Sequence, residues 1–263
     1  MRLSVFALVC LFLTACATRE KGRERISFNQ EWRFALTEKQ ANASAPDTDD
    51  SNWRVLNLPH DWSIEADFSL DNPATPGGGA LPGGMGWYRK HFKLPESDKG
   101  KVIYIDFDGV YQNSRVWLNG HLLGFRPNGY VSFRYDLTPY LNYGKEENVL
   151  VVQADNSDQP NSRWYSGAGI FRSIELLHMP KLHIASDGIF GYTKSIEYDT
   201  LGNPVCAYLH TEVELQNETL ENKMALVEVF LTKDGSDEVL LSRKQKMQIN
   251  PNTTDTAYLN LTL

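Results

Sequence analysis

Short runs of β-branched and aromatic residues, separated by turn-forming dipeptides, make up the chain from Ile26 onward. Apolar and polar positions alternate in many of these runs, and no long stretch follows the helical period. The pattern predicts strands at 31–36, 55–58, 86–94, 102–107, 110–118, 121–125, 131–135, 148–154 and 170–178, then at 182–186, 188–193, 207–216, 224–233, 239–249 and 256–263. Such a density of strands indicates an all-β fold of antiparallel sheets packed face to face, as a sandwich or jelly roll.

Turn signals divide this series of strands. Asn119-Gly120 predicts a two-residue hairpin turn, and Asp108-Gly109 predicts another turn before the strand at 110–118. Pro180 ends the last strand of a first domain at 26–180, which we expect to be a jelly roll. The roughly 80 residues of 181–263 are fewer than the roughly 100 of an immunoglobulin-type sandwich. Because they end on the apolar run AYLNLTL, we expect an immunoglobulin-like β-sandwich that is truncated.

The first 25 residues differ from the rest. Arg2 precedes an apolar run at 3–13, which closes on LTAC and so resembles a bacterial lipoprotein signal. The run is too short to span a bilayer, which takes a helix of roughly 20 residues. We therefore expect a signal peptide at 1–15, a lipid on Cys16, a flexible tether at 16–25 and a membrane-anchored place in the bacterial cell envelope. An ordinary secretory signal or a buried helix is the alternative.

Composition narrows the possible partners. The formal net charge is −7, and the basic residues form no stripe, so a nucleic-acid partner is not expected. The six tryptophans suit a sugar binder, but they also suit any tightly packed β-protein. Once Cys10 and Cys16 are set aside, Cys206 stands alone and predicts no internal disulfide.

The segment SRWYSGAGIFR at 162–172 is the strongest candidate for a binding surface. The Arg163 guanidinium offers a planar fork of donors for hydroxyl or carboxylate groups, and the rings of Trp164 and Tyr165 offer flat apolar faces for a sugar ring. Alternatively, Arg163 is a surface ion-pair partner and the two aromatic residues plug the end of a sandwich.

Two other stretches accompany this segment. In LPHDWS at 58–63, Asp61 can bond a ligand or only the backbone of its turn, and Trp62 can anchor a site or only fill the core. Residues 71–86 hold six glycines and three prolines, which predicts a long exposed loop. We expect this loop to belong to a binding rim, with disorder as the alternative.

No stretch marks a catalytic centre. Glycoside hydrolysis needs two carboxylates that flank the scissile bond, roughly 5 Å apart in retaining enzymes, and no pair is singled out by its sequence context. Asn217-Glu218 superficially matches an Asn-Glu pair of some glycosidases but lies in a polar turn. The histidines lack metal-ligand spacing, and no P-loop or Gly-x-Ser-x-Gly motif occurs, so we expect no catalytic residue, metal or cofactor. The acids considered, each interpreted as a surface acid or turn former, are Asp61, Glu65, Asp67, Asp71, Asp106, Asp108, Asp155 and Asp158.

Taken in order, these stretches resemble the N-terminal part of glycoside hydrolase family 2 enzymes of the bacterial β-galactosidase type. The matching segments are FNQEWRF at 28–34, WRVLNLPHDWS at 53–63, GWYRKHF at 86–92, FDGVYQNSRVWLNGHLLGFRPNGYVSFRYDLTPYL at 107–141 and SRWYSGAGIFR at 162–172. The resemblance covers the chain from about residue 26 to its end. Several motifs in family order and spacing are more specific than any one of them.

The resemblance implies a jelly-roll sugar-binding domain, an immunoglobulin-like domain and, in the family, a catalytic barrel with two glutamates that this sequence does not contain. In family members, the loop matching Arg163 and Trp164 reaches over the barrel mouth and helps to hold the terminal sugar. We therefore expect Arg163, Trp164, Tyr165 and Asp61 to contact a β-galactoside-like sugar, and the chain alone to be inactive. Related enzymes often carry an acid where Arg163 stands.

Two other functions stay open at this point. A stand-alone, surface carbohydrate-binding lipoprotein predicts galactoside affinity that depends on Arg163 and Trp164. A structural or assembly module predicts no response to sugar and a tight protein partner.

Overall fold

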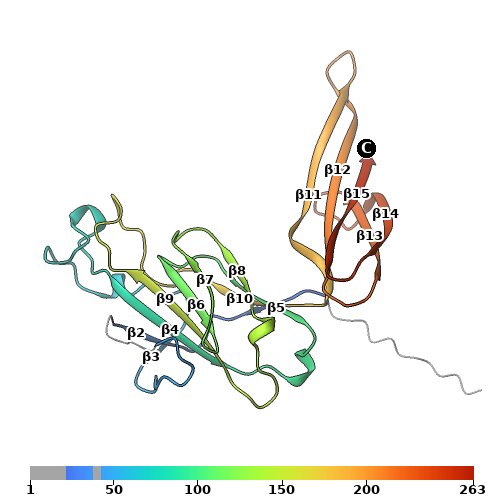
Figure 1. Cartoon of the computed structure of the whole chain (residues 1–263). Helices are drawn as coiled ribbons and strands as arrows, with labels where there is room; N and C mark the ends of the chain where they lie inside the picture. The colour runs from blue at the N-terminus through green and yellow to red at the C-terminus, as the bar shows by residue number, and fades with distance from the viewer. Residues whose placement is uncertain (1–21, 38–42) are drawn as a thin grey trace, which may run out of the picture.

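The computed structural model describes residues 22–37 and 43–263. They form antiparallel sheets joined by loops and by the short 3-10 helices η1 (Ser63–Glu65), η2 (Pro76–Gly78), η3 (Glu96–Asp98) and η4 (Thr138–Tyr140) (Figure 1). The sheets pack as sandwiches, which confirms the all-β prediction. The predicted signal peptide, Cys16 and most of the predicted tether lie outside the described residues.

Two sheets face one another in the first sandwich. The four-stranded sheet has the order β1 (Glu24–Ser27), β10 (Ile174–Met179), β5 (Val102–Phe107) and β8 (Phe133–Asp136). The six-stranded sheet has the order β3 (Arg54–Leu56), β2 (Trp32–Leu36), β4 (Gly84–Phe92), β9 (Asn148–Asn156), β6 (Ser114–Leu118) and β7 (His121–Arg126).

The core of this sandwich follows from strand periodicity. Ile103, Ile105 and Phe107 alternate along β5 and are all fully buried, because alternate residues point to the same face of a sheet. Phe107 stacks on Phe133 of β8, with ring centroids 4.7 Å apart. From the opposite sheet, Trp32 enters the same core and donates its indole N–H to a backbone carbonyl, so its one polar atom is satisfied.

Two further sheets form the second sandwich. One has the order β11 (Leu182–Tyr198), β12 (Pro204–Asn217) and β15 (Thr253–Thr262), and the other pairs β13 (Lys223–Thr232) with β14 (Val239–Ile249). Their facing side chains enclose a smaller core of Val213, Leu215, Val227, Ile249, Ala257 and Leu259.

Three strand predictions need correction. β11 is a single strand where two were predicted, because the irregularity between Ile184 and Ile189 is accommodated within the strand as a bulge. β6 begins at Ser114 and not at 110, and it belongs to the six-stranded sheet, so the predicted turn at Asp108-Gly109 does not join two strands of one sheet. β1 begins at Glu24, inside the predicted tether, because its polar residues pair with β10 at the sheet edge.

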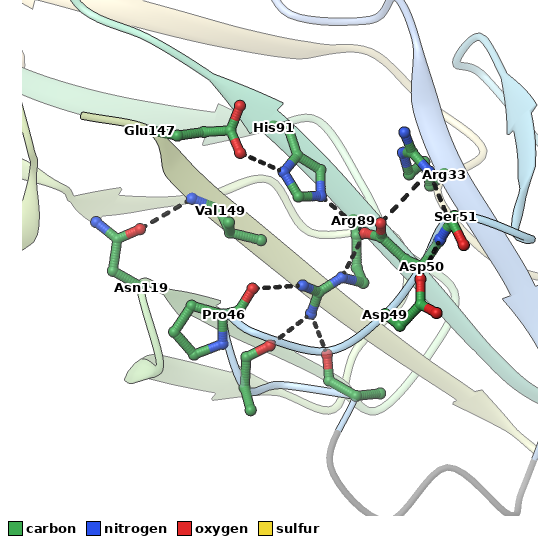
Figure 2. A network of polar contacts seen from close by, with 12 residues as sticks. Arg33, Pro46, Asp49, Asp50, Ser51, Arg89, His91, Asn119, Glu147 and Val149 are labelled. Carbon is green, nitrogen blue, oxygen red and sulfur yellow. Dashed lines mark hydrogen bonds and ion pairs between the residues drawn. The ribbon is translucent and has the colours of Figure 1, made fainter. Parts of the chain in front are cut away.

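A buried charge network fastens the segment before β3 to the outer face of the six-stranded sheet (Figure 2). The fully buried Arg89 donates its Nε–H to Asp50 at 2.7 Å and its remaining N–H groups to the carbonyls of Ala43, Ala45 and Pro46. His91 Nε2 lies 2.8 Å from the same carboxylate. Hydrogen bonds from these two partners outweigh burial and lower the pKa of Asp50.

Candidate functional site

Two loops meet at one end of the first sandwich because the strands that carry them are paired. Gly84, where β4 begins, pairs with Asn156, where β9 ends. The loop that enters β4 and the loop that leaves β9 therefore lie at the same end of the sheet. We call residues 57–83 and 157–173 the rim loops.

Asp61 and Tyr165, two of the predicted site residues, are in direct contact. The Tyr165 hydroxyl donates a hydrogen bond to Asp61 Oδ2, and Asp61 Oδ1 accepts the Ser63 backbone N–H at 3.0 Å. Burial and the bond to the Asp61 carboxylate raise the pKa of Tyr165 above its usual range. The tyrosine therefore stays protonated near neutral pH and holds the carboxylate in one orientation.

Trp164 and Arg163 face solvent beside this pair. The Trp164 side chain is 67% exposed, so it does not plug the sandwich. Arg163 is exposed as well, and its guanidinium makes no hydrogen bond or ion pair with any residue of 22–37 or 43–263. A flat ring and a donor fork are therefore both available to a ligand at this position.

Trp62, by contrast, fills the core. It is 3% exposed, and its ring lies against two glycines of neighbouring strands and loops. A Cβ on Gly86 would come within 2.4 Å of the Trp62 ring, and a Cβ on Gly169 within 2.1 Å of the Tyr88 hydroxyl. The glycines are thus required for close approach, and the structural alternative holds for Trp62.

A polar cluster beneath Asp61 fixes the course of its loop. His60 Nδ1 lies 2.8 Å from the buried Tyr88 hydroxyl, and the backbone N–H of His60 donates to the Ile170 carbonyl of the other rim loop. Glu65 accepts both arms of the Arg54 guanidinium fork at 2.6 Å, and this pair lowers the pKa of Glu65 to about 2. This cluster was not predicted from the sequence, because its members come from separate elements.

Asn156 organises the second rim loop from within. It is 3% exposed, and its Nδ2 donates to the Gly167 carbonyl at 3.2 Å. Its Oδ1 accepts the side-chain amides of Gln159 and Asn161 at 2.8 and 2.6 Å. Tyr130 adds a bond from its hydroxyl to the Ser166 carbonyl. This role was not predicted from the sequence, in which Asn156 lies two residues beyond the predicted strand at 148–154.

The glycine-rich segment is part of the rim. It forms η2 and turns back through Gly79 at φ +92°, where a Cβ would be 3.7 Å from Tyr165. The predicted loop therefore packs on the second rim loop, while its last residues, from Gly84, belong to β4. The cavity enclosed between the loops measures only about 10 Å³, which is room for about one water molecule and not for a sugar ring.

Two of the remaining candidate acids have structural partners. Asp106 is bonded to Arg134, and Asp155 accepts from Ser157. Asn217 is buried and donates to the carbonyls of its own turn, so the Asn-Glu pair is structural. Within residues 22–37 and 43–263, no three His, Cys, Asp or Glu side chains converge as metal ligands.

A larger cavity lies away from the rim loops. It measures about 850 Å³ and is lined by residues around the connection between the two sandwiches, among them Lys101, His178 and Lys223. None of its lining residues belongs to a rim loop.

No helix of the described part of the chain has the length and apolarity needed to cross a membrane.

Comparisons with known proteins agree with this architecture. A family model described as glycosyl hydrolases family 2, sugar binding domain, matches residues 26–180. The chain is 48% identical over 217 residues to the β-galactosidase BoGH2A of Bacteroides ovatus, covering 82% of this chain and 25% of the relative. It is 31% identical over 255 residues to a β-glucuronidase of Formosa agariphila, covering 86% and 25%.

Solved structures show the same likeness. A glycosyl hydrolase family 2 member from Bacteroides cellulosilyticus superposes with a TM-score of 0.80 at 31% identity, covering 91% of this chain and 30% of that one. A β-glycosidase from Bacteroides vulgatus gives a TM-score of 0.78 at 35% identity, covering 91% and 29%. The chain thus spans about a quarter of the length of the curated relatives.

Proposed function

Because the chain belongs to glycosyl hydrolase family 2 through its sugar-binding domain, we propose that its rim loops hold part of a β-galactoside-like sugar while groups outside these 263 residues cleave the glycosidic bond. Arg163 donates to sugar hydroxyls, Trp164 stacks on a sugar ring, and Asp61 accepts from a hydroxyl. Tyr165 positions Asp61 and adds ring surface.

The observation that carries this proposal is the contact between Tyr165 and Asp61. It joins two motifs 104 residues apart beside the exposed Trp164, and so gathers an acceptor, a donor fork and a ring face on one surface. Sugar sites combine such ring faces with a few polar groups that fix orientation.

The shape of the rim supports a shared site over a complete one. Ligand pockets commonly measure about 300–1,000 Å³ and bury most of the ligand, whereas the rim loops enclose about 10 Å³. A sugar on the rim is therefore bound on one side only, and a second surface has to cover its other side. This favours the rim of a larger glycosidase over a stand-alone carbohydrate-binding lipoprotein.

The division between binding and chemistry is tested with aryl glycosides. The purified chain is expected to release no nitrophenol from p-nitrophenyl β-galactoside above a buffer control, because under this proposal the two carboxylates that must flank the scissile bond lie outside these 263 residues. Release that survives purification to constant specific activity would overturn the proposal. Tight galactoside binding in calorimetry, lost in Arg163→Ala, would instead favour the stand-alone binding protein.

We also propose that Cys16 carries a lipid anchor that holds the chain at the bacterial cell envelope. The support is the LTAC sequence after an apolar run. Metabolic labelling with a radioactive fatty acid is expected to mark the wild-type chain and not Cys16→Ser. Labelling of both would contradict the anchor.

A further inference from the structure

The two sandwiches are joined by a connection of only two residues, Pro180 and Lys181, between β10 and β11. The second sandwich extends away from the first, and the two approach each other near this connection (Figure 1). Domains joined in this way move relative to one another unless other contacts hold them. The contacts across the junction therefore decide whether the second sandwich has a fixed direction.

Arg134 provides the first of these contacts. It projects from β8 beside Asp106 of β5, its register partner. Its guanidinium donates hydrogen bonds to the Asp106 carboxylate from Nε and from Nη2, and the Nη2 bond measures 2.6 Å. The Arg134 Cζ also lies 5.6 Å from the ring centroid of Tyr104. The remaining arm, Nη1, donates to the hydroxyl of Ser186 on β11. Two residues of the first sandwich thus aim the guanidinium at the second.

Tyr104 provides the second contact. Its side chain alternates with the buried Ile103 and Ile105, so it points out of the first sandwich. Its hydroxyl donates to Glu218 Oε1 at 3.2 Å, and Gln216 donates to the same oxygen at 2.9 Å. Burial raises the pKa of Tyr104, so the phenol keeps the proton that it donates.

From these contacts we propose that Arg134 and Tyr104 form a latch that fixes the second sandwich in one orientation relative to the first. The latch is independent of the sugar site, because none of its residues belongs to a rim loop. Partly exposed polar contacts are individually weak, so removing both contacts of the latch is expected to release the hinge.

The latch is tested by measuring how the sandwiches tumble in the full chain. In ¹⁵N relaxation, the wild-type chain is expected to show one rotational correlation time for both sandwiches. Tyr104→Phe with Ser186→Ala removes the two hydrogen bonds of the latch and leaves intact both the Arg134–Asp106 pair and the hydrogen bond from Arg23 to the Ile184 carbonyl. This double variant is expected to show a shorter correlation time for the second sandwich than for the first.

Arg115→Met is the matched control, because Arg115 bonds Gln153 and covers Phe125 within the first sandwich. It is expected to tumble like the wild type. A second readout is trypsin cleavage after Lys181, which is expected to accelerate in the double variant only. Two results would overturn the latch. One is separate correlation times for the two sandwiches in the wild type. The other is one shared correlation time in a folded triple variant that combines Tyr104→Phe, Ser186→Ala and Arg134→Met.

Discussion

Tyr165 donates a hydrogen bond to Asp61 across 104 residues of sequence, and this bond ties the two rim loops together. The pairing of Gly84 with Asn156 brings the two loops to the same end of the sheet. The side chains then decide which atoms meet there. Asp61 is held from both sides, by the Tyr165 hydroxyl and by the Ser63 N–H. Its carboxylate is therefore oriented before any ligand arrives.

Removing the Tyr165 hydroxyl is expected to loosen the rim without unfolding the sandwich. Tyr165→Phe keeps the ring but leaves Asp61 with one protein donor, so the free energy of unfolding should fall by about 1 kcal/mol. Urea unfolding followed by far-ultraviolet circular dichroism measures this change. Tyr198→Phe is the matched control, because that tyrosine is exposed on β11. An equal effect in both variants would contradict the assigned bond.

Gly169 is expected to tolerate no side chain. Its φ is +102°, and an added Cβ would lie 2.1 Å from the Tyr88 hydroxyl and 2.9 Å from the Trp62 ring. Gly169→Ala should lower the free energy of unfolding by about 3 kcal/mol, through overpacking and backbone strain together. Gly202 has φ +85° with nothing near its would-be Cβ, so Gly202→Ala isolates the strain. Equal losses in chemical denaturation would show that no clash occurs.

Removing the buried Arg89 side chain is expected to be costly. Arg89→Met leaves Asp50 buried with fewer partners and frees three carbonyls, so we expect a loss of about 3–5 kcal/mol. Thermal unfolding of Arg89→Met beside Arg115→Met measures the difference. A melting temperature for Arg89→Met as high as that of Arg115→Met would refute the role of the network in Figure 2.

The Arg54–Glu65 pair is expected to add an acid-sensitive increment to stability. The pKa of Glu65 is lowered to about 2 in the folded chain from 4.5, so the increment is complete above pH 4.5 and is lost as the pH falls towards 2. Because Glu65 is 39% exposed, the increment should not exceed about 1 kcal/mol. Glu65→Gln cannot titrate and should flatten this part of a stability–pH curve. An unchanged slope would contradict the assignment.

Local signals predicted individual strands well. The bounds of β14, Val239–Ile249, were predicted correctly because its ends coincide with clear turns. Asn119 and Gly120 both have positive φ, as their two-residue turn between β6 and β7 requires. Asp61 and the segment 163–165 were both predicted from the sequence as candidate site residues, and the structure brings them to one rim.

Long-range partners could not be predicted in the same way. Arg89 lies in a strand, and the alternation of polar and apolar residues does not show which acid will pair with it. Its partner, Asp50, is 39 residues away in the sequence. The chain crosses from β5 in one sheet to β6 in the other, which depends on pairings that no turn dipeptide specifies. Trp62 and Trp164 look equally prominent in the sequence, and only the glycines at 86 and 169 explain why Trp62 is buried.

The central claim is that sugar is contacted at the rim, and a titration of the ¹⁵N-labelled chain with methyl β-galactoside tests it most directly. We expect weak, fast-exchange shifts of the Trp164 indole N–H and of the Arg163 Nε–H, with the buried Trp62 indole unmoved. Arg163→Ala should reduce the Trp164 shift. Shifts confined to the residues that line the 850 Å³ cavity at the junction, with Trp164 unaffected, would contradict the account.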